Sequence, residues 1–151
     1  MEDNNKKGFT LIEILIVIVI LSIMALVVGF AYITFLTHTN VNSTNQEIYS
    51  IIKSAQDDSL NNLDGYQNYG VYFSSTSVTL FQGDSYSQTD ATNKVYNFPP
   101  SVYISNINPA SNNPIVFASQ TGQLTNSGIS FVLGNISYSI NVNININGAV
   151  Y

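Results

Sequence analysis

The chain falls into three stretches that differ in the spacing of their apolar residues. Residues 14–36 carry no charged side chain and are apolar almost throughout. In residues 37–65 the apolar side chains recur every three or four positions, which is typical of an amphipathic helix. Residues 66–151 hold short runs in which apolar and polar residues alternate, as in strands with one buried face. The pattern predicts an α+β chain in which one long amino-terminal helix packs against an antiparallel β-sheet.

The apolar stretch is long enough to cross a membrane. As a helix, residues 14–36 would extend about 35 Å, and the hydrocarbon core of a bilayer is about 30 Å thick. Lys6 and Lys7 precede this stretch, and basic residues favour the cytoplasmic side. Two alternatives are a plain amino-terminal anchor and a secretory signal peptide that is cleaved after Ala31. Neither alternative explains Glu13, the acid at the head of the apolar run.

The helix is predicted to continue beyond the apolar stretch. It would run from Phe9 to about Leu63, with Asp64 and Gly65 as its carboxy-terminal stop. Its second half presents one apolar face, which the following residues must cover. The residues predicted to form this face are Val41, Thr44, Ile48, Ile51, Ile52, Ala55 and Leu60.

The strand predictions rest on alternation and on turn residues between the runs. Residues 74–77 are predicted to be a hairpin loop, and Gly134-Asn135 a two-residue type II′ turn. The clearest alternation lies in residues 136–147, where Ile, Tyr or Val occupies every even position and Ser or Asn lies between them. The predicted strands cover residues 69–73, 78–81, 95–98, 102–107, 115–118, 129–133 and 136–147.

Composition argues against most kinds of chemistry. The chain has no cysteine, which excludes disulfides and thiolate metal sites. Its formal charge is −5. His38 is the only histidine, so neither a Ser-His-Asp triad nor a zinc site is expected. Asp84 and Asp90 could offer oxygen ligands to calcium, although solvated loop acids are the commoner case. We expect no catalytic residues and no cofactor, and hence not an enzyme.

Nucleic acid is not an expected partner of this subunit. Beyond Lys7, the chain offers only Lys53 and Lys94 to phosphate groups, and acids outnumber them. The ten tyrosines and eight phenylalanines could form a stacking or adhesive surface. Such residues more often form strands and cores, and that interpretation is preferred.

The amino-terminal sequence resembles a known signal. Residues 6–13, KKGFTLIE, followed by ILIV, are similar to the class III signal of type IV prepilins and of the pseudopilins of type II secretion and competence systems. The resemblance implies that a prepilin peptidase cuts after Gly8 and that the new amino terminus, Phe9, is methylated. It also implies that Glu13 is the residue needed for assembly.

Physical chemistry is consistent with that role for Glu13. A carboxylate at the head of a membrane helix costs about 2.5–3.5 kcal/mol on insertion scales, so a partner is expected. A free amine on Phe9 would lie one helical turn away, and the pair could close within one subunit or between neighbouring subunits. The simpler alternative is that Glu13 only caps its own helix.

The resemblance further implies a pilin fold and a sequence of segments. These are a leader peptide over residues 1–8, a transmembrane and filament-core helix over 9–36, the amphipathic half over 37–65 and a β-rich head over 66–151. The head more weakly resembles H-type minor pseudopilins, through residues 69–73, residues 115–117 before Thr121-Gly122, and residues 144–148. It lacks the cysteine pair of many major pilins, and the helix has Gly29-Phe30 where theirs has a proline.

The expected function is therefore that of a structural subunit of a type IV pilus-like filament. The alternative is a minor pseudopilin that acts as a tip adaptor in type II secretion or DNA uptake. Expected partners are other pilin subunits of the same or another kind, the prepilin peptidase, the inner-membrane assembly platform and membrane lipid. The precursor is expected in the inner or cytoplasmic membrane of a bacterium, and the product in a surface or periplasmic filament.

Overall fold

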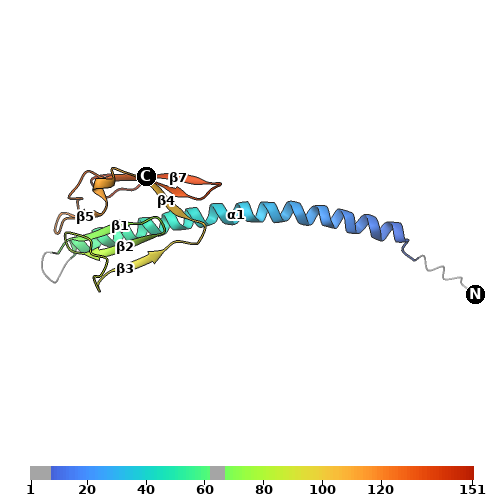
Figure 1. Ribbon diagram of the computed structural model, residues 1–151, viewed down its shortest axis with the longest axis horizontal. Helices are drawn as coiled ribbons and strands as arrows, with labels where there is room; N and C mark the ends of the chain where they lie inside the picture. Colours follow the sequence, from blue (N-terminus) through green and yellow to red (C-terminus); the bar gives the residue numbers. More distant parts are fainter. Residues whose placement is uncertain (1–7, 62–66) are drawn as a thin grey trace, which may run out of the picture. The chain divides into compact units, whose positions relative to one another are not determined.

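The computed structural model describes residues 8–61 and 67–151, and Figure 1 shows the order of its elements. The predictions for Lys6, Lys7 and the helix stop at Leu63–Gly65 lie outside the described residues. The chain forms two compact units that divide between Leu36 and Thr37. The elements are α1 (Leu11–Leu60), β1 (Tyr69–Phe73), β2 (Ser77–Gln82), β3 (Lys94–Asn97), β4 (Tyr103–Asn108), η1 (Ala110–Asn112), β5 (Ile115–Phe117), β6 (Ile129–Gly134) and β7 (Ser139–Ile144).

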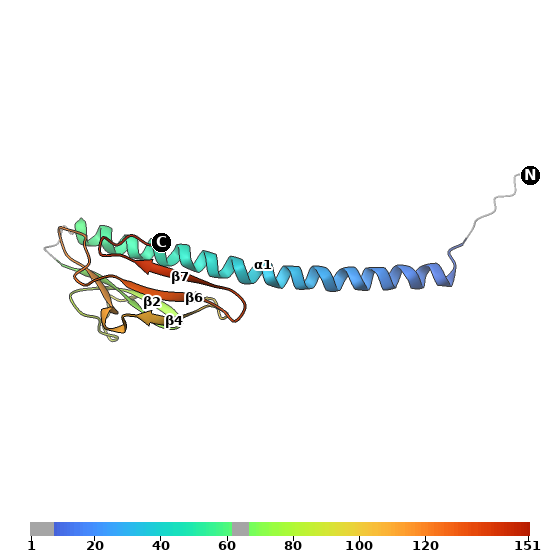
Figure 2. The same ribbon diagram turned by 90° about the horizontal axis from the view of Figure 1, so that it is seen from above.

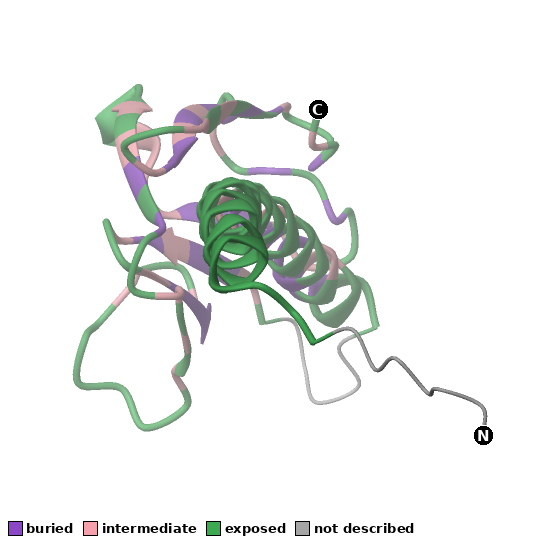
Figure 3. Cartoon of the chain, turned by 90° about the vertical axis from the view of Figure 1, so that its right-hand side faces the viewer, coloured by how far each residue is buried: buried purple, intermediate pink, exposed green. Residues whose placement is uncertain are grey.

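Helix α1 belongs to both units, and its two halves differ in burial. Every residue of the helix up to Leu36 is exposed, as the green ribbon in Figure 3 shows. Beyond Leu36 a single face of the helix is buried, by Val41, Thr44, Ile48, Ile51, Ile52, Ala55 and Ser59. The predicted face is thus confirmed except at its end, where Ser59 is buried and Leu60 is exposed.

The described helix ends at Leu60. Asn61 closes the last turn, because its backbone N–H and its side-chain Nδ2 both donate to the carbonyl of Asp57, at 2.9 and 3.0 Å. These bonds satisfy a carbonyl that the helix itself leaves without a partner.

The predicted α+β layout, one long helix packed against antiparallel β structure, is confirmed, and the strands form two antiparallel sheets. The first, sheet A, has the order β3-β2-β1-β5, and the second, sheet B, has the order β4-β6-β7. Figure 1 shows β1, β2 and β3 side by side, and Figure 2 shows β4, β6 and β7. Alternation defines a buried face in each strand and does not define which strands pair, so the sequence did not divide the strands between two sheets.

The predicted hairpin over residues 74–77 is confirmed, since β1 pairs with β2 directly across that loop. The predicted strand over residues 136–147 is wrong at both ends, because β7 covers only Ser139–Ile144. Ile136 is 97% exposed and Ile146 is 53% exposed, so neither joins the buried face. Val142 and Ile144 are buried while Asn141 and Asn143 are exposed, so the alternation holds within the strand itself.

The predicted type II′ turn at Gly134-Asn135 is also wrong. Gly134 remains in β6 and pairs with Ser139, which leaves a four-residue loop over 135–138. The backbone N–H of Asn135 donates to the carbonyl of Tyr138 at 2.8 Å. The side-chain oxygen of Asn135 accepts the N–H groups of Ser137 and Tyr138, at 2.9 and 2.8 Å. This asparagine turn takes the place of the glycine-based turn.

One core lies between the carboxy-terminal half of α1 and the two sheets. Ile48 and Ile52 from the helix are completely buried together with Phe73 from sheet A and Phe131 from sheet B. The rings of Phe73 and Phe131 lie 5.0 Å apart between centroids, so the two sheets meet at this pair. Burial of such side chains contributes about 1.5–3 kcal/mol each.

Sheet A is also covered on its outer face. The ring of Phe81 is buried there and lies over Gly70, where a Cβ would come within 2.3 Å of it. Tyr86, from the segment after β2, stacks on Tyr72 with centroids 4.1 Å apart and meets the edge of Phe81. The segment 83–93 therefore packs back on sheet A through aromatic rings.

Candidate functional site

The first candidate site is the segment around the predicted cleavage position. Gly8, Phe9 and Thr10 precede the helix and are exposed, and Phe9 retains 85% of its accessible surface. A Cβ placed on Gly8 would meet no heavy atom within 4 Å. The described chain thus presents the Gly8–Phe9 bond in the open, outside any helix or strand.

Thr10 and Glu13 form a reciprocal cap on the first turn of α1. The backbone N–H and the hydroxyl of Thr10 both donate to Oε2 of Glu13, each at 3.0 Å. In return, the N–H of Glu13 donates to the Thr10 hydroxyl at 3.3 Å. The arrangement is a capping box, in which a Thr and the Glu three residues later satisfy each other's backbone groups. The sequence pattern Thr-x-x-Glu could have identified Thr10 as the partner of Glu13, which the sequence reasoning missed.

The predicted pair between the amine of Phe9 and Glu13 requires a cut chain. In the uncut chain the nitrogen of Phe9 is part of a peptide bond and carries no charge. Among the described residues, Oε1 of Glu13 has no hydrogen-bond partner, because Thr10 uses Oε2 alone. One carboxylate oxygen thus remains for another group while the cap is intact.

The apolar half of α1 has the properties of a membrane span. It is the one helix, within the described residues, that is long and apolar enough to cross a bilayer. Its hydroxyl groups are satisfied within the helix, since Ser22 donates to the carbonyl of Ile18 at 2.7 Å and Thr34 donates to that of Phe30 at 3.1 Å. Such bonding lets polar side chains lie in lipid without an unpaired donor.

The head does not bring the other candidate residues together. Asp84 accepts a hydrogen bond from Asn68, while Asp90 accepts the N–H and hydroxyl of Thr92. The described residues contain no group of three metal-ligating side chains. His38 stacks on the ring of Tyr138 with centroids 4.0 Å apart, a contact that no sequence pattern had indicated.

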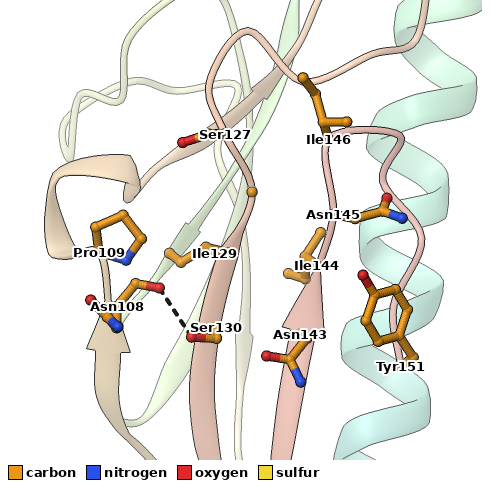
Figure 4. A pocket seen from close by; sticks show the side chains of 11 residues that line it. Asn108, Pro109, Ser127, Ile129, Ser130, Asn143, Ile144, Asn145, Ile146 and Tyr151 are labelled. Carbon is orange, nitrogen blue, oxygen red and sulfur yellow. Dashed lines mark hydrogen bonds between the residues drawn. The ribbon is translucent and has the colours of Figure 1, made fainter.

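A groove of about 650 Å³ on sheet B is the second candidate site. Asn108, Ser130 and Asn143 follow one another across the three strands, and Tyr151 extends this row because it exchanges backbone hydrogen bonds with Asn143. Figure 4 shows their side chains and the bond from the Ser130 hydroxyl to the Asn108 carbonyl. Residues 95–151 contain no Asp, Glu, Lys, Arg or His, so none of these side chains lines the groove.

Comparison with known families gives a match that covers the segment of the first candidate site and does not reach the second. Residues 3–29 match the family described as the prokaryotic N-terminal methylation motif. This motif is a structural, pilin-type motif rather than an enzymatic one. No curated protein and no solved structure matches the chain. The likeness of the head to H-type minor pseudopilins therefore stays a prediction. The motif, the exposed Gly8–Phe9 bond and the long apolar helix agree, and this chain carries the class III prepilin signal of type IV pilins and pseudopilins.

Proposed function

We propose that this chain is a structural subunit of a type IV pilus-like filament, polymerised through its amino-terminal helix. The proposal rests on two observations together: the prepilin signal, and an apolar helix half whose side chains are exposed. From Leu11 to Leu36 the apolar side chains are exposed, with no packing partner among the described residues of their own chain. Lipid would cover them before assembly, and the helices of neighbouring subunits would cover them afterwards.

Processing is proposed to occur between Gly8 and Phe9, with methylation of the new amino terminus. The open surroundings of Gly8 support this, because a side chain at that position would meet nothing in the described fold. A requirement for glycine there would then come from the prepilin peptidase and not from folding. Lys6 and Lys7 would hold the leader on the cytoplasmic side.

Assembly is proposed to rest on a pair between the amine of Phe9 and the carboxylate of Glu13 in a neighbouring subunit. Cleavage converts the neutral peptide nitrogen of Phe9 into a cation, which is expensive to leave unpaired in a medium of low dielectric. Oε1 of Glu13 could receive it while Oε2 stays within the cap. The axial register of the filament would then be set where the pair closes.

The motif implies processing by prepilin peptidase and assembly with other pilins. We further propose that the inner-membrane assembly platform takes up the cleaved subunit from the membrane. The destination would be a filament on the cell surface or in the periplasm.

Mass spectrometry of sheared, purified filaments from the native cell tests the proposal. We expect a mature chain that begins with methylated Phe9 and is present as a filament component. High abundance would indicate a major subunit, and a trace amount would favour the minor pseudopilin or tip adaptor. A mature chain that begins after Ala31 and is absent from filaments would contradict the proposal and support ordinary secretion.

A further inference from the structure

Ile136, in the loop between β6 and β7, is more exposed to solvent than any large apolar side chain in the strands of the head. Ile136 retains 97% of its accessible surface, whereas Val142 and Ile144 of the adjoining strand are buried. A single exposed apolar side chain is common on protein surfaces and carries no meaning alone. The residues around Ile136 make its exposure informative.

The loop holds Ile136 outward in an ordered turn. Asn135 accepts the N–H groups of Ser137 and Tyr138 through its side chain and donates its own N–H to the Tyr138 carbonyl. These three bonds fix the backbone on both sides of Ile136. The isoleucine is therefore presented by the fold and is not the end of a loose segment.

The stacking contact between Tyr138 and His38 places this loop at one end of the head. Their rings lie 4.0 Å apart between centroids, with planes inclined by 23°. His38 is the second residue of the head unit, which begins at Thr37. The loop thus lies at the end of the head from which the apolar half of α1 continues. Figure 2 shows the β6–β7 hairpin reaching along the helix to this region.

Helix α1 is continuous from the apolar stretch to His38, so the rise per residue gives the distance between them along the helix axis. From Ile14 to Leu36 the helix rises about 33 Å, which is enough to cross a hydrocarbon core of about 30 Å. His38 follows Leu36 by about 3 Å along the axis, whereas the headgroup layer on each side is about 5–8 Å deep. If residues 14–36 cross the bilayer, Tyr138 would lie level with this layer because it stacks on His38, and Ile136, two residues before Tyr138 in the loop, could extend up to about 7 Å from it.

The chemistry of the neighbouring residues suits a lipid interface. Residues 14–46 of the helix and residues 95–151 carry no Asp, Glu, Lys or Arg, so these segments add no charged side chain that would have to be dehydrated. Tyr32, about one turn before the end of the apolar stretch, and Tyr138 of the loop are of the residue type that gathers at membrane interfaces.

We propose that the loop of residues 135–138 is a second membrane contact, with Ile136 inserted into the interfacial layer of the bilayer that α1 crosses. This inference rests on the proposed membrane anchor. The contact would exist before assembly and would have to be released when the subunit leaves the membrane. It would hold the head against the bilayer surface and restrict rotation of the whole subunit about the axis of its helix.

Tryptophan fluorescence tests the contact, because the chain has no tryptophan of its own. Three single variants of the full-length chain are placed in phosphatidylcholine vesicles, with and without bromine on the acyl chains. Ile136→Trp probes the loop, and the near-complete exposure of Ile136 makes the change tolerable to the fold. Val27→Trp probes the membrane span. Ala91→Trp probes the far end of the head, since Ala91 lines the same cavity as Asp58, about 30 Å along the helix from His38.

We expect strong bromine quenching for Val27→Trp, partial quenching with a blue-shifted emission for Ile136→Trp, and neither effect for Ala91→Trp. If Val27→Trp is quenched and Ile136→Trp matches Ala91→Trp, the inference is wrong while the membrane anchor stands. If Ile136→Trp is blue-shifted but not quenched, protein covers the loop and the inference is also wrong. If no variant is quenched, both the anchor and the inference are wrong.

Discussion

The side-chain amide of Asn113 pairs with the backbone of Phe73 as a strand residue would. Its Oδ1 accepts the N–H of Phe73 at 3.0 Å, and its Nδ2 donates to the carbonyl of Phe73 at 2.8 Å. The backbone pairing between β1 and β5 ends at Val71 and Ile115. Asn113 thus extends the edge of sheet A beyond the last pair of backbone partners. Both groups of Phe73 are satisfied beside a completely buried ring that belongs to the core.

Replacing Asn113 with aspartate should destabilise the head. Asn113→Asp keeps an acceptor for the N–H of Phe73, but it removes the donor and sets a carboxylate against the Phe73 carbonyl. We expect a loss of about 1–3 kcal/mol in unfolding free energy, the usual cost of an unsatisfied buried group. Thermal unfolding followed by circular dichroism measures it. The matched control is Asn143→Asp, at an exposed position of β7, which should change stability by less than about 0.5 kcal/mol. Equal effects at both sites would mean that the bonds to Phe73 contribute nothing.

Replacing Gly8 with a bulky residue should block processing and leave folding intact. A side chain at Gly8 meets no atom within 4 Å, so the helix and the head should be unaffected. We expect the full-length precursor to accumulate in the membrane fraction, with the intact mass measured by mass spectrometry. Gly29 offers a control, because it also has open surroundings and lies in the apolar span. Gly29→Ala should be cleaved normally, and a block in both variants would point to a defect in membrane insertion instead.

Glu13→Val should abolish filaments while insertion and cleavage continue. The change removes a charge from the head of the membrane helix, so insertion becomes easier. The amine of Phe9 would then be buried without a counter-charge during assembly. Electron microscopy counts the filaments, and immunoblotting of membrane fractions counts the cleaved subunits.

Thr10→Val separates the assembly role of Glu13 from its capping role. This variant removes the hydroxyl and with it two of the three bonds of the cap, while the backbone N–H of Thr10 and the carboxylate of Glu13 stay in place. We expect cleaved subunits and filaments to persist in Thr10→Val, with a helix start weakened by about 1 kcal/mol. If Thr10→Val loses filaments as completely as Glu13→Val does, the cap explains the requirement and the intersubunit pair loses its support.

A fragment that begins at Thr37 should fold without the apolar half of the helix. The division into units falls between Leu36 and Thr37, and the described core residues all lie beyond it. We expect a soluble fragment with dispersed amide resonances and a cooperative thermal transition. A fragment without amide dispersion would show that the head needs the apolar helix in order to fold.

The loop acid Asp90 should titrate at low pH. The backbone N–H of Thr92, followed by its hydroxyl, donates to the carboxylate, and both bonds hold the pKa of Asp90 below its ordinary value. Since the pKa is lower in the folded state, the carboxylate stabilises the loop above the unfolded pKa, and this contribution is lost as pH falls through the folded pKa. NMR titration of the side-chain carbon measures the pKa. Thr92→Val should raise it only in part, because the backbone bond remains, and an unchanged pKa would contradict the contribution of the hydroxyl.

Periodicity predicted the helix and most strands because the buried residues of these elements lie on one side of each. The buried positions of α1 from Val41 to Ala55 lie one or two turns apart on a single side, which the sequence displays directly. Strand β1 matches its predicted bounds because turn residues flank it. The roles of Gly8, Phe9 and Glu13 were predicted through a resemblance and stay predictions, since the peptidase and the neighbouring subunit that would select these residues lie outside the chain.

The errors arose where contacts distant in sequence decide the outcome. Leu60 fits the helical period, but the helix ends there, and Ser59 takes the buried place beside the backbone of Gln120. Residues 136–138 continue the strand alternation, yet the side-chain bonds of Asn135 and the contact of Tyr138 with His38 turn them into a loop. The pairing of strands into sheets and the packing of Tyr86 on sheet A also depend on such contacts, which the local spacing of apolar and polar residues does not predict.

The charge-free composition of sheet B determines how its surface responds to ionic strength. Salt weakens contacts between fixed charges over a screening length of about 10 Å at 0.1 M. The outward row of Asn108, Ser130 and Asn143 has no such charge to screen, and its hydrogen bonds are short-range. An association made through hydrogen bonds of this face, whether with another subunit or with a surface outside the cell, would have an affinity that depends little on ionic strength. Its specificity would come from shape and hydrogen-bond geometry.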